Sequence, residues 1–429
     1  MARLNSFQKL MLQWNELHPY NAVHMVRIAA RLDHGSLKRA IQETLESREL
    51  IALRLDSKKG SCSFSGGPAN VGLAILDAEG ADWASLSPVI EEYLNTPFAL
   101  DAPFCPFRFF AVRGSDSFVF GLSYFHVIAD AESIVHLARE ILQRYLAPDE
   151  RPVSRWEAPK LSEPPSLRNP LILARALGNF PSRLAGIRES ARPRVRDPEN
   201  LHNSCAFFSL EANDLVALVE ASRSLNVTLN DLFLALLMKS LVPLTAGRAD
   251  RRKRRKIALG CIVNTRRSLG ISSGEEFGVF LGSFVVTHEV PRRIGLTDLA
   301  RAIRLQTERI KDRKLYLDSA FEAVFASLMF SFFSTGRRKK FYPKHYPLWG
   351  GITNMNLNTL WPRQPGETGW DYCRTVSTGP ATPLVLSITT VADRVNIGVS
   401  YRTTVFSARD VEQIKGDFLG NIQQLKGKE

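Results

Sequence analysis

The sequence has few cysteines and lacks the short motifs that mark the commonest cofactor and metal sites. H-E-x-x-H, G-x-x-x-x-G-K-[ST] and G-x-G-x-x-G do not occur. The chain therefore lacks the motif residues of a zinc protease, a P-loop protein and a Rossmann protein. The cysteines are odd in number, widely separated and without a C-x-x-C pair, which argues against a disulfide framework or a zinc site and fits a reducing cytosol. They are Cys62, Cys105, Cys205, Cys261 and Cys373. We therefore expect no metal and no permanently bound cofactor.

Long hydrophobic runs are also absent. The longest nearly uncharged apolar stretch, Ala323–Phe333, is shorter than the roughly 20 residues that a bilayer-spanning helix needs. The first 18 residues are interrupted by polar side chains every few positions and contain no hydrophobic region of a signal peptide. These absences predict a soluble, cytoplasmic protein, which we expect to be a monomer.

Basic residues outnumber acidic ones by 56 to 43, which gives a formal net charge of +13. Part of the excess lies in two runs, RRKRRK at Arg251–Lys256 and GRRKK at Gly336–Lys340. A positive charge favours an anionic partner such as nucleic acid, a membrane, a phosphorylated cofactor or an acidic protein, but each run also fits a solvated loop. Nucleic acid is not an expected partner, because RRKRRK has no interleaved aromatic residue and no known nucleic-acid module occurs.

The length of 429 residues and a hydrophobic content of 45% favour two packed units. In the first, residues 1–160, apolar spacing predicts helices near residues 7–17 and 37–45 and strands at 21–33 and 50–55. Seven prolines between Pro148 and Pro181 interrupt a basic stretch with little regular pattern, and we assign residues 161–198 to a linker. The second unit is residues 199–429.

The second unit also mixes strands with helices. Strands are predicted at 206–210, 257–267, 277–290 and within 383–403, and helices around 215–219 and at 299–311. In residues 226–241, Thr228 and Asp231 have the spacing of a capping box at the start of a helix. This helix is apolar nearly all round and is therefore expected to be buried. The pattern in both units predicts two α/β lobes.

His126 lies four residues before Asp130, at the point where a strand becomes a helix. Phe118, Phe120, Leu122 and Tyr124 alternate along the strand, and His126 continues their parity. A helix then begins, with apolar residues from Ile134 to Tyr145 at helical spacing. Such a junction is a place where side chains converge on a cleft.

Other candidate catalytic groups are weaker. GLSYF around Ser123 lacks the second glycine of G-x-S-x-G, so Ser123 is not expected to be a nucleophile. His288 and Glu289 are adjacent on a predicted strand and point to opposite faces. The remaining histidines stand in no motif and are expected to be structural: His18, His24, His34, His136, His202 and His345.

The region around His126 resembles the active site of the coenzyme A-dependent acyltransferase and condensation-domain superfamily, which includes chloramphenicol acetyltransferase. The shared order is PF-x-L at Pro97–Leu100, a proline, two strands, H-x-x-x-D at His126–Asp130, a serine and a helix ending in tyrosine. Further similar stretches are RLDHGSLKRAIQETLESRELIALRL, VTLND at 227–231 and VNTRRSLG at 263–270. The chain is most similar to the stand-alone bacterial condensation-like acyltransferases. The resemblance implies two lobes, each a mixed β-sheet with flanking helices, and an active-site tunnel between them.

The resemblance also implies roles for individual residues. His126 is the expected general base, and Asp130 is expected to pair with an arginine that holds the loop in shape. That arginine corresponds to Arg266, with Arg267 as the alternative. For the tetrahedral intermediate, Thr353, Asn354 or Asn356 could donate a hydrogen bond, and we favour Asn354.

The sequence departs from the family pattern beside the histidine. Phe125 stands where a second histidine is common, Ala131 replaces the glycine after the aspartate, and no D-F-G-W-G occurs, which argues against the plant-type enzymes. The methyl group of Ala131 is expected to narrow the route for pantetheine.

The resemblance implies an acyltransferase that moves an acyl group from coenzyme A or an acyl carrier protein to a hydroxyl or amine of a small-molecule or lipid-like acceptor. Both donors are acidic, and Arg251–Lys256 is a candidate docking strip for either. The alternative is a catalytically silent module that binds a carrier protein or another acidic partner. A third hypothesis is weak peripheral membrane contact through residues 325–347, where an apolar stretch joins a cationic one; the competing interpretation is a buried helix followed by a basic loop.

Overall fold

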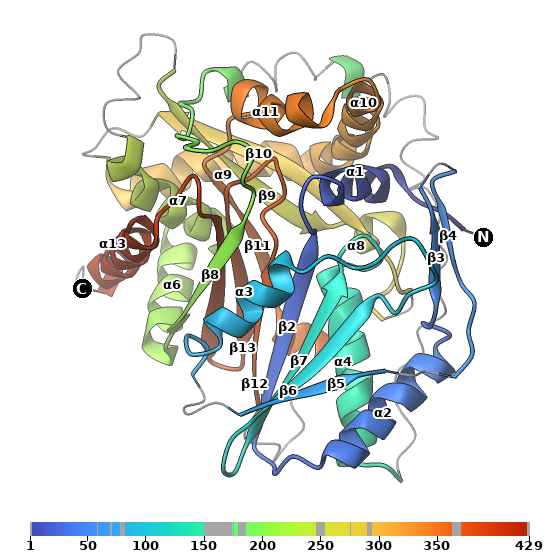
Figure 1. The fold of residues 1–429 in the computed structure, drawn as a ribbon. Coiled ribbons are helices and arrows are strands. Elements are labelled where there is room, and N and C mark those ends of the chain that lie inside the picture. The colour runs from blue at the N-terminus through green and yellow to red at the C-terminus, as the bar shows by residue number, and fades with distance from the viewer. Residues whose placement is uncertain are drawn as a thin grey trace.

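The computed structural model describes residues 2–57, 59–68, 71–77, 82–149, 174, 176–178, 186–245, 254–274, 276–289, 294–362 and 370–426. Within these ranges, two mixed sheets with helices on their faces form the two predicted lobes (Figure 1). A third, small antiparallel sheet lies at the edge of the N-terminal lobe, in the order β1 (Ala2–Arg3), β4 (Ser61–Phe64) and β3 (Leu53–Asp56). The predicted α/β class is confirmed.

The sheet of the N-terminal lobe has five strands in the order β12-β2-β7-β6-β5. Its neighbours are antiparallel except for β5 and β6, which are parallel. The strands are β2 (Asn21–Ile28), β5 (Leu73–Asp77), β6 (Phe107–Arg113), β7 (Phe118–Phe125) and β12 (Trp370–Val376). Since β12 comes from the C-terminal half of the chain, this sheet takes one strand from beyond the predicted unit of residues 1–160. The boundaries at residues 160 and 198 stay predictions, and residue 160 lies outside the described ranges.

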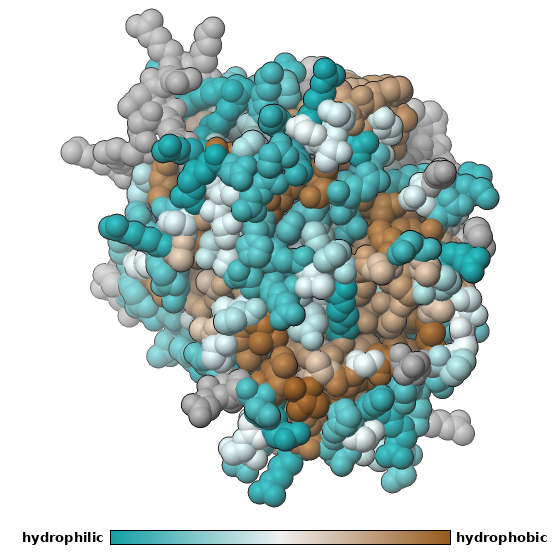
Figure 2. Space-filling view, viewed as in Figure 1, coloured by the Kyte–Doolittle hydropathy of each residue, from teal (hydrophilic) through white to brown (hydrophobic). Residues whose placement is uncertain are grey.

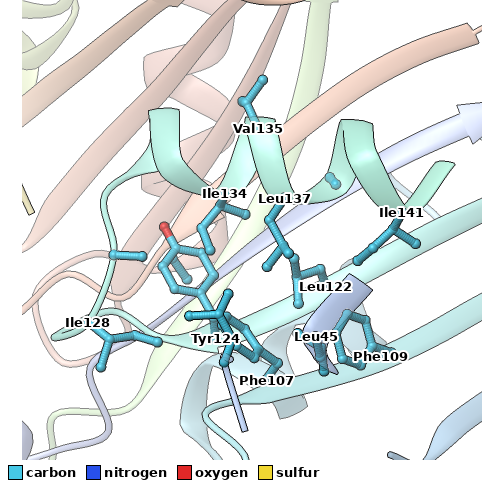
Figure 3. Close-up of a cluster of buried hydrophobic side chains, with 14 of the residues drawn as sticks. Leu45, Phe107, Phe109, Leu122, Tyr124, Ile128, Ile134, Val135, Leu137 and Ile141 are labelled. Atoms are coloured by element: carbon cyan, nitrogen blue, oxygen red, sulfur yellow. The ribbon is translucent and has the colours of Figure 1, made fainter. Parts of the chain in front are cut away.

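Alternation along β7 explains how this sheet is buried on both faces. Leu122 and Tyr124 point toward α4 (Ala131–Leu146), whose apolar stripe includes Ile134, Leu137 and Ile141 (Figure 3). Helix α2 (His34–Ser47) packs beside α4 on the same face. The opposite face is covered by α3 (Ser87–Asn95) and by a strand of the other lobe. The end of β7 is therefore fixed within packed core.

The sheet of the C-terminal lobe has six strands in the order β10-β9-β11-β13-β14-β8. β11 pairs in parallel with β9 and β13, and the other neighbours are antiparallel. The strands are β8 (Asn203–Leu210), β9 (Lys256–Asn264), β10 (Leu281–Glu289), β11 (Gly350–Asn356), β13 (Leu384–Val391) and β14 (Arg394–Arg402).

Helices α6 (Ala212–Ser224), α7 (Leu229–Leu241), α9 (Leu296–Asp312) and α13 (Ala408–Lys426) pack in the C-terminal lobe. The predicted capping box starts α7: the backbone N–H of Thr228 donates to Asp231 Oδ2 over 2.9 Å, and the Asp231 N–H donates to Thr228 Oγ1 over 3.3 Å. Ten of the thirteen α7 residues are buried, as its nearly uniform apolar character predicts. No single described helix is long and apolar enough to cross a bilayer, although α6 and α7 meet that test as a pair bent by 106°.

Residues 325–347 differ from the interpretation of a buried helix followed by a basic loop, and membrane contact through them stays a prediction. They belong to α10 (Ser319–Ser331) and α11 (Thr335–His345), so the predicted basic loop at Gly336–Lys340 is helical. In α10 only Ser319, Ala323 and Phe330 are buried, so this is not the buried helix that was the alternative. The helices lie beside α1 (Ser6–Asn15) at the top of the molecule in Figure 1.

The other basic run, Arg251–Lys256, is only partly described. Residues 251–253 lie outside the described ranges. Arg254 Nη1 donates to the Ser190 carbonyl over 3.1 Å, and Lys256 Nζ lies 2.6 Å from Glu189 Oε2. The docking role of this strip stays a prediction. The remaining short elements are α8 (Arg266–Leu269), α12 (Leu357–Leu360), η2 (Val242–Thr245) and η3 (Leu315–Asp318).

Candidate active site

His126 follows the last residue of β7 and is held by contacts from the segment that leads into β2. Its backbone N–H donates to the Tyr20 carbonyl over 3.1 Å. The imidazole stacks on the Tyr20 ring at 5.3 Å between centroids and meets the edge of Tyr124 at 5.5 Å. The side chain is buried. The end of a packed strand and two aromatic rings therefore orient the imidazole.

A single hydrogen bond determines which ring nitrogen of His126 can act as a base. Nδ1 lies 2.9 Å from the Ala129 carbonyl oxygen. A carbonyl oxygen only accepts, so Nδ1 carries the proton and Nε2 keeps its lone pair in the neutral ring. Nε2 has no hydrogen-bond partner among the described residues. The imidazole is thus prepared to accept a proton at Nε2.

The surroundings also keep His126 neutral. Burial is the largest influence and lowers the pKa of His126, and the charge of Arg374 acts in the same direction. The Ala129 hydrogen bond and the Asp130 carboxylate oppose this effect only in part, so the pKa stays below its ordinary value. A neutral imidazole near pH 7 is the form that accepts a proton.

Asp130 points away from His126 and into a two-point ion pair. Arg266 Nη1 donates to Asp130 Oδ2 over 2.6 Å and Nη2 donates to Oδ1 over 3.1 Å. Burial alone would raise the pKa of Asp130, but the Arg266 charge and the hydrogen bonds outweigh it and lower the pKa. The alternative arginine, Arg267, is exposed. Arg266 is therefore the residue that the structure pairs with Asp130.

The same pair joins the two lobes at the start of α4. Asp130 caps the helix by accepting from the Ser133 N–H over 3.0 Å, and the Phe280 N–H donates to Asp130 Oδ2 over 2.9 Å. The Asp130 N–H in turn donates to the Gly278 carbonyl over 2.9 Å. One carboxylate thus fixes the loop after His126 against the C-terminal lobe.

Arg374, on β12, is a buried cation that the sequence patterns did not single out. Its Nε donates to Thr389 Oγ1 over 3.1 Å, and Nη2 donates to the carbonyls of Thr353 and Ile388 over 2.9 and 3.1 Å. Nη1 has only a long contact of 3.5 Å with Thr353 Oγ1. No carboxylate of the described residues forms an ion pair with Arg374, and burial lowers its pKa. Burying a charge with spare hydrogen-bonding capacity costs free energy. Arg374 is therefore a candidate for a functional role.

His24, which the sequence predicted to be only structural, also lies in the site. It is the direct cross-strand neighbour of Arg374, and its Nδ1 is hydrogen-bonded to the Tyr372 hydroxyl. Burial holds the pKa of His24 well below its ordinary value, and the charges of Arg374 and His126 add to this effect. The alternation of β12 places Tyr372 and Arg374 on one face of that strand, but it does not show that β2 is the neighbouring strand.

The proposed hydrogen-bond donors on β11 lie on opposite faces. Thr353 faces Arg374, whereas Asn354 is exposed, and successive strand residues alternate between faces. Asn356 is also exposed and caps α12 by accepting from the Asn358 N–H over 3.1 Å. The structure brings Thr353 to the Arg374 cluster and gives Asn354 no contact with it among the described residues.

The two departures beside the histidine occupy ordinary positions. The ring of Phe125 points into the core, 6.0 Å from Phe98 and 5.9 Å from Phe104 between centroids, so it is turned away from His126. Ala131 is the first residue of α4, where alanine favours the helix. In the described residues no cluster of three or more His, Cys, Asp or Glu has the arrangement of a metal site.

Comparison with known proteins gives similarity in structure but not in sequence. No family model matches the sequence, and no curated protein matches it. Many solved structures do match. One is the X-domain from teicoplanin biosynthesis, at 17% identity and a TM-score of 0.65, with 99% of this chain and 95% of that chain covered.

Two further matches span nearly all of both chains. Polyketide synthase associated protein 5 from Mycobacterium tuberculosis matches with 14% identity and a TM-score of 0.69, covering 99% of each chain. A mutant starter condensation domain of rhizomide synthetase, in complex with C8-CoA and Leu-SNAC, matches with 14% identity and a TM-score of 0.68, covering 99% of this chain and 94% of that one.

Proposed function

Because the chain has the two-lobed fold of the condensation-domain and chloramphenicol acetyltransferase-like superfamily, we propose that it is an acyltransferase with His126 as its general base. The donor is an acyl thioester of coenzyme A or of an acyl carrier protein. The acceptor is a hydroxyl or an amine. The observation that carries the proposal is the hydrogen bond from His126 Nδ1 to the Ala129 carbonyl, which leaves the lone pair on Nε2.

Proton transfer at Nε2 balances each step of this reaction. Nε2 takes the proton of the acceptor hydroxyl or amine while the acceptor atom forms a bond to the thioester carbonyl carbon, and the carbonyl oxygen becomes an oxyanion. When the oxyanion collapses, the carbon–sulfur bond breaks and the leaving thiolate takes the proton from Nε2. The other ring proton stays on Nδ1, hydrogen-bonded to the Ala129 carbonyl oxygen, throughout.

The developing oxyanion needs a hydrogen-bond donor or a positive charge. Asn354, favoured from the sequence, is exposed on β11, and Thr353 is the β11 residue that lies with Arg374. We propose Arg374 as the source of positive charge in the site, because its Nη1 has only one long hydrogen-bond contact. Asp130 and Arg266 are positioning residues, since they act through the loop that holds His126.

The experiment is acyl transfer by the purified protein, measured by mass spectrometry of the product with a panel of acyl-coenzyme A and acyl-pantetheine thioesters and candidate acceptors. We expect His126→Ala to lower turnover roughly 10²- to 10⁴-fold. His34→Ala, at an exposed histidine on α2, is the matched control and should keep wild-type activity. Turnover that persists at the wild-type level in His126→Ala would contradict the proposal.

A second candidate is a catalytically silent module that binds a protein partner. It is favoured by the structural similarity to an X-domain that was solved in a complex with OxyB, at 16% identity and a TM-score of 0.60. The same assay separates the two functions, since a silent module turns over no thioester in either the wild type or the variant. A pull-down with acyl carrier protein would then test the binding role.

A further inference from the structure

Helix α10 carries an exposed apolar stripe. Phe325, Leu328 and Phe332 are 46%, 60% and 85% exposed. They are three of the seven large exposed hydrophobic residues in the described part of the chain, and they lie within eight residues of one another. Their spacing of three and four places them on one side of α10. Figure 2 shows hydrophobic residues gathered at the position of this helix.

The stripe faces outward because the other side of α10 already has a partner. Phe330 is fully buried among Phe333, Phe341 and Tyr342, and Ala323 is buried beside α1. The buried side of α10 therefore packs on α1 and α11, and the stripe lies on the more exposed side. Exposed aromatic residues that are gathered in this way mark an interaction site more often than a random surface does.

Helix α11 adds a cationic stripe directly after the apolar one. Arg337, Lys340 and Lys344 are exposed and, at spacings of three and four, share one side of the helix. None of these three forms an ion pair with a described carboxylate. The other two cations of α11 are already used, since Arg338 pairs with Glu16 over 2.7 Å and Lys339 with Glu199 over 3.1 Å.

We propose that the α10–α11 pair docks the protein on an anionic lipid surface. Large apolar side chains enter the boundary between headgroups and acyl chains, while lysine and arginine pair with the headgroup phosphates. The composition fits this division of roles: residues 319–347 contain five Lys or Arg and one acidic residue, Glu322. A lipid surface offers both phosphates for the cationic stripe and an acyl-chain region for Phe325, Leu328 and Phe332.

The docking face connects to the proposed catalytic histidine through aromatic packing. Tyr342 of α11 accepts a hydrogen bond from Trp14 Nε1 over 3.1 Å, and the Trp14 ring contacts Tyr20 at 5.5 Å. Tyr20 in turn stacks on His126. This connection favours a lipid-like acceptor that is held at the membrane. The choice of acceptor rests on the proposed function, but membrane docking does not.

The test is flotation of the full chain with vesicles of phosphatidylcholine alone or with 30% phosphatidylglycerol, a composition chosen as roughly that of a strongly anionic membrane. We expect binding to the anionic vesicles at low salt and at least about tenfold weaker binding to the neutral ones, because surface potentials attract basic segments. Salt should weaken the binding by screening. Absence of binding at low salt would overturn the proposal.

Two variants separate the stripes. Phe325→Ser/Leu328→Ser/Phe332→Ser and Arg337→Glu/Lys340→Glu/Lys344→Glu should each weaken anionic-vesicle binding about tenfold or more, in line with losing three inserted side chains or reversing three charges. The matched control is Leu305→Ser with Arg301→Glu on α9, where Leu305 is 71% exposed, and it should bind as the wild type does. Circular dichroism checks that every variant is folded.

Two outcomes would assign the face differently. Wild-type binding by both stripe variants would contradict the proposal. A molar mass that differs between the wild type and the apolar variant, measured by light scattering without lipid, would also contradict it. That result would identify the face as an interface between two copies of the chain. His126→Ala should float as the wild type does, so that failure of the acyl-transfer assay would leave the docking result intact.

Discussion

Arg266 lies beside two carboxylates, so the loss of Arg266 and the loss of Asp130 should not destabilise the fold equally. Besides Asp130, its Nε lies 3.6 Å from Glu132 Oε1, and its guanidinium lies 4.4 Å above the ring of Phe280. The side chains of Arg266 and Asp130 are only 3% and 2% exposed. Removing one member of a buried pair leaves the other charge without compensation, at a cost of about 3–5 kcal/mol.

We therefore expect Arg266→Met to destabilise the fold more than Asp130→Asn does. The first leaves two carboxylates without a cation, while the second leaves Arg266 with Glu132 and keeps a side chain that can still cap α4. Urea unfolding of both variants measures the difference, with Arg267→Met, at an exposed arginine, as the control. A larger loss in Asp130→Asn would mean that the cap, not the charge, is the more important contribution.

The charge of Arg374 should set the pH at which the proposed base is lost. Arg374 lowers the pKa of His126, so Arg374→Met should raise that pKa. Because activity requires the neutral imidazole, the acid limb of the rate against pH should move to higher pH, and the maximal rate should fall if Arg374 also stabilises the oxyanion. Arg374→Lys, which keeps a positive charge, should restore the position of the acid limb. An acid limb that does not move in Arg374→Met would refute the electrostatic role.

Three residues of the site could be predicted from sequence and two could not. His126, Asp130 and Arg266 lie in motifs that carry their own local signals. Arg374 and His24 meet across β12 and β2 and are separated by about 350 positions along the chain, as in the 348-residue separation of the His24–Tyr372 hydrogen bond. Such a contact depends on strand pairing between distant segments, which a local pattern does not encode.

At the scale of elements, β14 and β12 approach closely where the two sheets meet. A Cβ atom on Gly398 of β14 would lie 2.2 Å from the Arg374 carbonyl oxygen, so the strands cannot keep their separation with a side chain there. This glycine is required for a close approach of backbones.

We expect Gly398→Ala to cost about 1–3 kcal/mol by overpacking and to lower acyl transfer along with stability. Gly416→Ala is the control, because Gly416 lies within α13 and a Cβ there meets no atom within 4 Å. That change should stabilise the protein by about 0.5–1 kcal/mol through helix propensity. Unfolding midpoints and turnover measure both effects, and a neutral Gly398→Ala would show that β14 and β12 can move apart freely.

The elements were easier to predict than their partners. Strands β2, β7, β9 and β13 and helices α4, α7 and α9 overlap the predicted ranges, because each has a clear period of apolar residues. The pairing of β12 with β2, and the placement of β3 in a separate small sheet, have no local signal. Residues 336–340 were a candidate loop because they are charged, yet they form the first turns of α11, whose aromatic residues Phe341 and Tyr342 supply the packing that stabilises it.

For the whole molecule, buried and partly buried histidines predict an acid-sensitive fold. Burial lowers the pKa of His18 and of His136 from 6.5 to about 4, and the pKa of His24 and His126 is also lowered. The unfolded chain binds these protons from pH 6.5 downward and the folded chain does not, so stability falls as the pH drops from about 6.5 toward 4. The lowered pKa of Asp130 has its effect only below its ordinary value of 3.8.

Each of these histidines should contribute a slope of up to about 1.4 kcal/mol per pH unit to the free energy of unfolding in that window. Urea unfolding at pH 7, 6 and 5 measures the slope. Replacing His18 or His136 with Gln should reduce it, while His34→Gln, at an exposed position on α2, should leave it unchanged. A stability that is constant from pH 7 to 5 would contradict this account.

The pairing of β12 with β2 affects how the protein folds during synthesis on the ribosome. Until residue 376 has been synthesised and has left the exit tunnel, the N-terminal sheet lacks its last strand, and β2 presents an open edge of unpaired N–H and C=O groups beside an apolar core. Such an edge is a template for aggregation. The nascent chain must therefore keep β2 protected, by a chaperone or by delayed folding, through the translation of some 350 further residues, at a rate of about 5–20 residues per second.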